Sequence, residues 1–132
     1  MSRYLLPAAA VACLLLSACG GNSARQAAVD AANAGLPSAY RDGLVTERAH
    51  SKGNAVVLDI RFAEARVAQL QAKPFLRDAL QVDEQEAISE LCADAALGDY
   101  LKDGGVVRRR FIDADGALFF EVSLDGRHCP TS

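Results

Sequence analysis

The stretch Ala55-Val56-Val57-Leu58-Asp59-Ile60-Arg61-Phe62 carries the clearest strand pattern in the chain. Its even-numbered residues from 56 to 62 are all apolar, whereas its odd-numbered residues include Asp59 and Arg61. Successive side chains of a strand point to opposite faces, so the apolar residues share one face. We expect that face to be buried and the face with Val57, Asp59 and Arg61 to be wet, which is typical of an antiparallel sheet.

A second strand precedes this stretch. Residues 44–50, Leu-Val-Thr-Glu-Arg-Ala-His, have a weaker strand pattern, and Ser51-Lys52-Gly53-Asn54 between the two strands is rich in turn formers. Two strands joined by a short turn of this composition predict a hairpin.

A second hairpin is expected near the C-terminus, from residues 106–113 and 118–125. The turn between them is Asp113-Ala114-Asp115-Gly116, which ends in the Asp-Gly pair favoured in tight hairpins. Alternation on the last strand predicts that four apolar residues share a face: Leu118, Phe120, Val122 and Leu124.

Between the two predicted hairpins the sequence has helical patterns. Residues 63–72 have helix-forming composition, and Pro74 argues against a simple continuation. A new helix is predicted from Asp83, because Asp83 and Glu86 resemble a capping box. Its core-facing stripe would be Ala87, Ile88, Leu91, Cys92 and Ala95. Residues 94–102 predict a further turn or two, which Asp103-Gly104-Gly105 ends.

These elements together predict an α+β fold. The simplest arrangement is a four-stranded antiparallel sheet of two hairpins, with helices packed on one face, in ββαββ order. A short alanine-rich helix over residues 23–34 would precede it, with Ser23 as its N-cap and Gly35 as its stop. The pattern leaves the order of the strands open.

The first 19 residues have a short basic start, an apolar run and a cysteine that follows two small residues. Met1-Ser2-Arg3 is a short basic start, and Tyr4 to Leu16 is an apolar run. That run is shorter than the roughly 20 residues that span a bilayer. Leu16-Ser17-Ala18-Cys19 then resembles the lipobox, so the whole stretch resembles the signal of a bacterial lipoprotein. The alternative is a plain secreted protein with a cysteine near its start by chance.

The lipobox resemblance implies that the chain is cut before Cys19 and that Cys19 carries diacylglycerol and a further acyl chain such as palmitate. Residues 19–24 would form a lipidated linker, flexible at Gly20-Gly21-Asn22-Ser23, and residues 25–132 a small periplasmic domain. The residue after Cys19 is Gly20 rather than Asp, which favours the outer membrane over retention at the inner membrane.

Charge and size limit the function further. Removal of residues 1–18 from the 132-residue chain leaves 114 residues, enough for one domain. The removed segment contains Arg3, so the remaining chain has 13 basic and 17 acidic residues and a net charge of −4. This acidic balance gives no support for nucleic-acid binding.

Two of the four cysteines remain for the domain, because Cys13 lies in the signal and Cys19 is the lipid site. Cys92 and Cys129 are an even pair in an oxidising compartment, so we predict a disulfide between them. The alternative is metal binding or thiol redox chemistry, for which His128 is the only nearby ligand.

Few residues suggest a catalytic or metal-binding role. His50 and His128 are the only histidines, and neither belongs to a visible triad. The Asp113/Asp115 pair could hold calcium, but its glycine comes too early for an EF-hand loop, so a hairpin turn is favoured. No metal site and no cofactor are predicted.

The run Arg108-Arg109-Arg110 could contact an anion or a partner protein. On a strand, Arg108 and Arg110 would share one face and Arg109 the other. The alternative is a solvated face on which arginine stems cover the sheet and their charges meet carboxylates. If Arg109 faces the core, it needs a carboxylate partner.

Residues 36–129 have a recognisable layout: Leu36-Pro37, a helix carrying Cys92, a strand led by Gly105, the Asp113–Gly116 turn and the closing Cys129. This layout resembles that of small uncharacterised periplasmic domains of proteobacteria. It implies a fold but brings no activity.

We therefore expect a non-enzymatic lipoprotein, anchored to the membrane through Cys19, that binds another protein of the cell envelope. The alternative is a small-ligand-binding or inhibitor module that uses the Arg108–Arg110 strand. An enzyme is the least favoured class, because no catalytic set of residues is visible.

Overall fold

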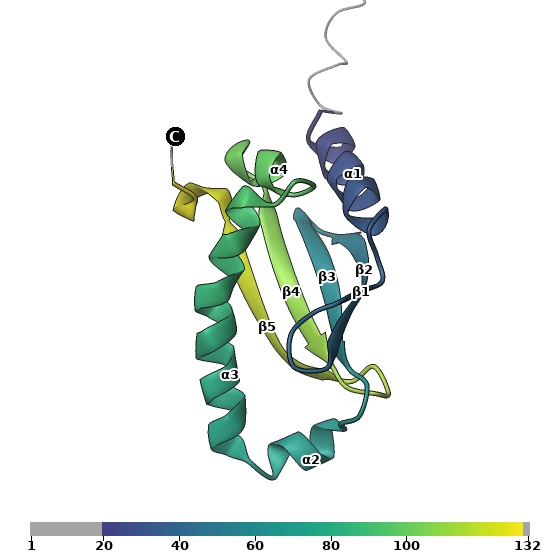
Figure 1. Ribbon diagram of the computed structural model, residues 1–132. Helices are drawn as coiled ribbons and strands as arrows, with labels where there is room; N and C mark the ends of the chain where they lie inside the picture. The colour runs from purple at the N-terminus through teal and green to yellow at the C-terminus, as the bar shows by residue number, and fades with distance from the viewer. Residues whose placement is uncertain (1–19, 131–132) are drawn as a thin grey trace, which may run out of the picture.

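The computed structural model describes residues 20–130, in which five strands form one sheet (Figure 1). The elements, in order, are α1 (Gly20–Asn33), β1 (Ser38–Ala39), β2 (Leu44–Lys52), β3 (Ala55–Phe62), α2 (Val67–Gln71), α3 (Pro74–Ala87), the 3-10 helix η1 (Ile88–Ala93), α4 (Gly98–Lys102), β4 (Val106–Ile112), β5 (Leu118–Asp125) and the 3-10 turn η2 (Gly126–His128). The predicted signal and lipobox lie outside the described residues.

The strand order is β1-β2-β3-β4-β5, and the predicted four-stranded antiparallel sheet is wrong in two respects. The short β1 adds a fifth strand, and β3 pairs with β4 in parallel, with Ala55 opposite Val106. The helical segment between them returns the chain to the end of the sheet at which β3 began, so β4 runs in the same direction as β3. The α+β class and both antiparallel hairpins are confirmed.

The main core lies on the helix-covered face of the sheet. Val56, Leu58 and Ile60 of β3 join one buried cluster with residues of α1, η1, α4, β4 and β5. The opposite face of β3 is buried too, with Val57 at 0% and Asp59 at 2% exposure, so the prediction of a wet face is wrong for this strand. β3 lies in the middle of the sheet, and long side chains from β2 and β4 reach over Asp59.

Helix α1 begins at Gly20, where the sequence predicted a flexible linker as far as Ser23 and a domain starting at residue 25. Arg25 closes the first turn by donating to the side chain of Asn22 at 2.6 Å. At the other end the Asn33 side chain both donates to and accepts from the backbone of Ala49 in β2. Of the helices that the structure describes, none is long and apolar enough to cross a bilayer.

The middle helices differ from the prediction in their boundaries. The first, α2, covers only Val67–Gln71 rather than residues 63–72. The second, α3, begins at Pro74, so Asp83 lies inside the helix rather than at its N-cap. Proline is tolerated at the first helical position, because the N–H that it lacks would have no partner there.

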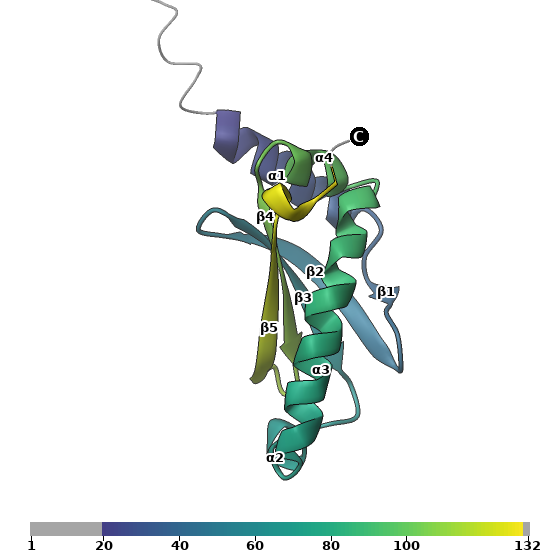
Figure 2. The same ribbon diagram turned by 90° about the vertical axis from the view of Figure 1, so that its left-hand side faces the viewer.

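Helix α3 lies beside the outer edge of β5 and bonds to it through a series of side chains (Figure 2). Three residues spaced four apart donate to alternate carbonyl oxygens of the strand: Arg77 to Phe119 at 3.3 Å, Gln81 to Glu121 at 3.5 Å and Gln85 to Ser123 at 3.0 Å. Four helical residues rise about 6 Å and two strand residues about 6.8 Å, so the two spacings nearly match. The helix thereby covers an edge that could otherwise pair with another strand.

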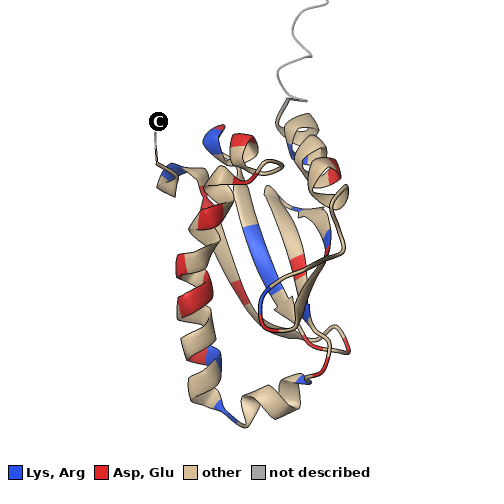
Figure 3. Ribbon diagram, in the orientation of Figure 1, with Lys and Arg blue, Asp and Glu red and all other residues tan. Residues whose placement is uncertain are grey.

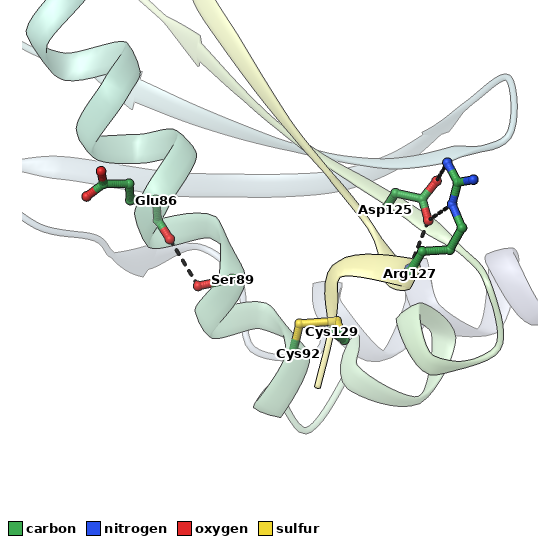
Figure 4. Close-up of a disulfide and its surroundings, with 6 residues drawn as sticks. All are labelled: Glu86, Ser89, Cys92, Asp125, Arg127 and Cys129. Carbon is green, nitrogen blue, oxygen red and sulfur yellow. Dashed lines mark hydrogen bonds and ion pairs between the residues drawn. A yellow bond between two sulfur atoms is a disulfide. The ribbon is translucent and has the colours of Figure 1, made fainter. Parts of the chain in front are cut away.

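Cys92 of η1 and Cys129 form a disulfide that joins the end of η1 to the chain leaving β5 (Figure 4). Next to it, the Gly126 N–H donates to the Gly105 carbonyl at 3.1 Å. A Cβ at Gly126 would lie 1.6 Å from the Leu101 carbonyl oxygen, so only glycine fits between η2 and α4.

The prediction that Leu118 shares a face with the other apolar residues of β5 is wrong, because a bulge lies at the start of this strand. The register of β4 and β5 shifts between Phe111 and Ile112, which places Leu118 opposite Ile112 and Phe120 opposite Phe111. Phe119 is therefore turned to the core side, where its ring lies 5.9 Å from that of Phe62, and Leu118 is exposed. An extra residue in one strand reverses the alternation beyond it.

Candidate functional site

The three consecutive arginines of β4 divide between the two faces of the sheet, as strand alternation predicted. Arg108 and Arg110 lie on the face that lacks the helices, each about a third exposed. Arg109 faces the helices and is 5% exposed, so it cannot contact a partner in this conformation. The arginine run therefore does not form one contact surface.

Arg109 has the carboxylate partner that its burial demands. Its Nη2 donates to Oε1 of Glu90 at 2.6 Å, and its guanidinium lies over the ring of Tyr40, 5.0 Å from the centroid. Its Nη1 is buried without a hydrogen-bond partner. A charge-assisted bond and a cation–π contact together offset part of the cost of burying the charge.

A polar cluster around Glu84 continues from Arg109 toward the loop after β1. The Tyr40 hydroxyl donates to Oε2 of the buried Glu84 at 2.5 Å, and Arg41 Nε donates to Oε1 at 3.2 Å. Burial, followed by the bond to Glu84, raises the pKa of Tyr40 far above its ordinary value. The cluster ties this loop to α3. The sequence prediction missed it, since its members are more than 40 positions apart.

The face of the sheet away from the helices has its own ion-pair network around Asp59. Arg48 Nε donates to Oδ2 of Asp59 at 2.9 Å, and His50 Nε2 lies 3.2 Å from Oδ1. Arg110 lies between Asp59 and Glu121, about 4 Å from each carboxylate. His50 is thus held against a carboxylate. Among the described residues no group of three or more His, Cys, Asp or Glu side chains could hold a metal ion.

Asp113 organises the turn of the second hairpin rather than a calcium site. Its carboxylate accepts the backbone N–H groups of Val67, Asp115 and Ala117 at 2.8 to 2.9 Å. These bonds, that of Val67 foremost, lower the pKa of Asp113. The turn therefore also holds the first residue of α2.

A small cavity of about 310 Å³ adjoins Arg109 on the helix-covered face. Its walls come from the end of α1, the segment between η1 and α4, and the sheet, and they include Ala32, Leu36, Leu58, Leu91 and Leu97. Its polar lining residues are Ser38, Thr46, Asp94 and Arg109, so the cavity combines apolar walls with a few hydroxyl and charged groups.

The exposed large apolar side chains of the described chain gather on α3 and at the start of β5. They are Phe75, Leu76, Val82 and Leu118, of which Phe75 is 87% and Val82 59% exposed. Acidic residues accompany them along α3 (Figure 3). We call Phe75, Leu76 and Val82, together with Asp78 and Glu86, the α3 surface. The strand and helix patterns gave no sign that these apolar residues would be exposed.

No family model and no curated protein match the chain. Three solved structures resemble it. A pilotin of the type 2 secretion system of Vibrio vulnificus, EpsS, has a TM-score of 0.56 at 23% identity, with 85% of this chain and 96% of that one covered. The type II secretion system pilotin AspS of Vibrio cholerae has a TM-score of 0.52 at 19% identity, over 83% and 94% of the chains.

The third structure is a secreted protein of Pseudomonas aeruginosa, with a TM-score of 0.57 at 13% identity and 83% and 92% of the chains covered. At these identities the similarity establishes a shared fold. The shared region includes nearly the whole of each neighbour.

Proposed function

We propose that this chain is a lipid-anchored, non-enzymatic accessory protein of the bacterial cell envelope that binds another envelope protein. The observation that carries this proposal is the fold, which the chain shares with two secretion-system pilotins over nearly their whole length. The resemblance of Leu16–Cys19 to a lipobox supports the anchor, and Gly20 rather than Asp after Cys19 supports an outer-membrane location facing the periplasm.

The α3 surface is the best candidate for the contact with the partner. It presents Phe75 and Val82 to solvent, and burial of such side chains in an interface is favourable by about 25 cal/mol per Å². Carboxylates of Asp78 and Glu86 line a groove beside Val82. The chemistry that fits is a protein segment whose apolar side chains are flanked by lysine or arginine.

The decisive test is site-specific crosslinking in cells. A photoreactive amino acid replaces Val82 in the full-length protein, and a matched variant carries it at Lys52, which is exposed on the β2–β3 hairpin. We expect position 82 to capture one dominant envelope protein and position 52 to capture little of it. Equal capture from both positions, or no protein from position 82, would contradict the proposed surface.

A second variant separates folding from binding. Phe75→Ser removes an exposed ring that stabilises little, so the unfolding free energy should change by no more than about 0.5 kcal/mol. Capture from position 82 should nevertheless fall several-fold. Unchanged capture would exclude Phe75 from the interface.

The anchor has its own test in Cys19→Ser, which should release the protein from membranes and prevent acylation. If that variant stays membrane-bound and is processed as before, the lipoprotein assignment is wrong. Capture from position 82 that persists in the released protein would show that the domain alone recognises the partner.

The arrangement argues against the alternative ligand module based on the Arg108–Arg110 strand. The three guanidinium groups do not converge, because Arg109 faces the helices while Arg108 and Arg110 pair with Glu121 on the other face.

A further inference from the structure

The domain has two distinct ends. In both views the start of α1, α4 and the C-terminal η2 lie at one end, and α2 with the start of α3 lies at the other (Figures 1 and 2). Hydrogen bonds tie α4 and η2 to the chain beside them: the Tyr100 hydroxyl of α4 donates to the Asn54 carbonyl in the β2–β3 turn at 3.0 Å, and the Gly126 N–H of η2 donates to the Gly105 carbonyl. We call this group, together with the β2–β3 turn and η1, which are joined to it by the Tyr100 bond and the disulfide, the α1 end.

The connection between the predicted lipid and this end is short and helical. Cleavage before Cys19 leaves no residue between the lipidated cysteine and Gly20, where α1 begins. The helix is in turn fixed to the sheet, through buried Ala28 and Val29 and through the paired bonds of Asn33 to Ala49. A lipid at Cys19 would therefore hold the α1 end close to the bilayer and restrict how far the domain can turn.

The two ends also differ in charge and polarity. The α1 end carries exposed charges of both signs, Lys52, Lys102 and Arg127 beside Asp99 and Asp103. The exposed large apolar side chains of the described chain lie elsewhere, on α3 and at the start of β5. Helix α3 has four acidic residues and one basic residue. Anionic phospholipids would repel α3 more strongly than the mixed charges of the α1 end.

We infer that the α1 end rests on the phospholipid headgroups and that the α2–α3 corner with Phe75 is directed away from the membrane. This inference depends on the proposed lipidation of Cys19. The column of α3 and η1 places Phe75 about 30 Å from Cys92, at about 1.5 Å per α-helical and 2 Å per 3-10 residue. The α3 surface would thus meet its partner at a distance from the bilayer.

Energy transfer between the lipidated full-length protein and the bilayer surface tests the orientation. Two variants each receive one dye, through Lys102→Cys at the α1 end or Phe75→Cys at the far end. Cys92 and Cys129 are bridged and Cys19 would be acylated, so the new thiol takes the label. Each protein is inserted into preformed phosphatidylethanolamine/phosphatidylglycerol vesicles that contain a headgroup-linked acceptor.

We expect transfer from position 102 to exceed transfer from position 75 several-fold. Equal transfer would show that the domain turns freely on its tether, and stronger transfer from position 75 would show that α3 faces the lipid; either result overturns the inference. Flotation with the vesicles reports the anchor separately, and loss of flotation refutes the lipidation and the orientation together.

A flexible Gly-Ser segment inserted between Cys19 and Gly20 supplies the matched control. The insertion leaves the lipid and the domain unchanged but removes the helical connection. The difference between positions 102 and 75 should then shrink while flotation persists. An undiminished difference would mean that contacts at the α1 end, rather than the short connection, orient the domain.

Discussion

The α1 end and the α2–α3 end are built in different ways. At the α1 end a disulfide, a glycine that fits against Leu101 and the buried side chains of Ile88 and Leu101 leave little freedom. At the other end α2 has no buried residue, and α3 has none before Glu84. Regions with few buried contacts open at lower free energy than the core. Stability is therefore concentrated near the proposed anchor, and the exposed apolar surface lies on the less constrained part.

The largest effect should come from removing the disulfide. Replacement of Cys92 and Cys129 together by serine removes a link between residues 37 positions apart. The chain-entropy relation then predicts that the free energy of unfolding falls by about 3–4 kcal/mol. Urea unfolding measures the loss. Amide exchange should rise mainly in η1, α4 and η2; an increase confined to α2 and α3 would reverse the proposed contrast between the ends.

Gly126→Ala should have the next largest effect. The new methyl group would overlap the Leu101 carbonyl, so the backbone of η2 or α4 must shift at a cost of about 1–3 kcal/mol. Gly35→Ala is the matched control, because the nearest atom to its Cβ would be 3.9 Å away. If thermal denaturation shows equal stability for the two variants, the packing of η2 against α4 does not exclude a side chain at position 126.

The α3–β5 contact should contribute less. Gln81→Ala and Gln85→Ala each remove one bond to a β5 carbonyl, worth about 1 kcal/mol, whereas Asp83→Ala changes an exposed residue of the same helix. Hydrogen exchange should become faster in α3 and remain unchanged in η1. Faster exchange throughout the domain would mean that α3 unfolds together with the core.

The smallest effect should appear on acidification, at the turn that holds α2. The pKa of Asp113 is lowered in the folded state, so its contribution is complete above the unfolded value of about 3.9 and is lost as pH falls through the folded value. Wild type should therefore exceed Asp113→Asn in stability at neutral pH, and the difference should vanish in acid. A constant difference in urea midpoint across this range would exclude the carboxylate as its source.

Local patterns accounted for much of the fold. The bounds of β3, and the existence of both hairpins and of an alanine-rich first helix, follow from short-range periodicity and turn residues, since these depend on neighbours within a few positions. The start of that helix at Gly20 was not predicted. The division of Arg108 and Arg110 from Arg109 follows from the same two-residue period. The start of α3 was misjudged, because Pro74 can begin a helix as well as end one.

The contacts of the candidate site could not be predicted from such local patterns. Tyr40 and Glu84 meet only because the loop after β1 lies against α3, and neither residue stands out in its own segment. The exposure of Phe75 and Val82 depends on how closely α3 approaches the sheet. A periodic apolar pattern cannot report that distance.

The sequence by itself determined the α+β class, the strand pairs joined by tight turns and the cysteines available for a disulfide, because each is encoded in adjacent residues or in the count of a residue type. Only the tertiary structure decided that β3 and β4 run in parallel, that α3 covers the edge of β5 and that Asp59 and Arg109 are buried. These features arise from contacts between residues far apart in the chain, whose free energies depend on the packing of the whole domain.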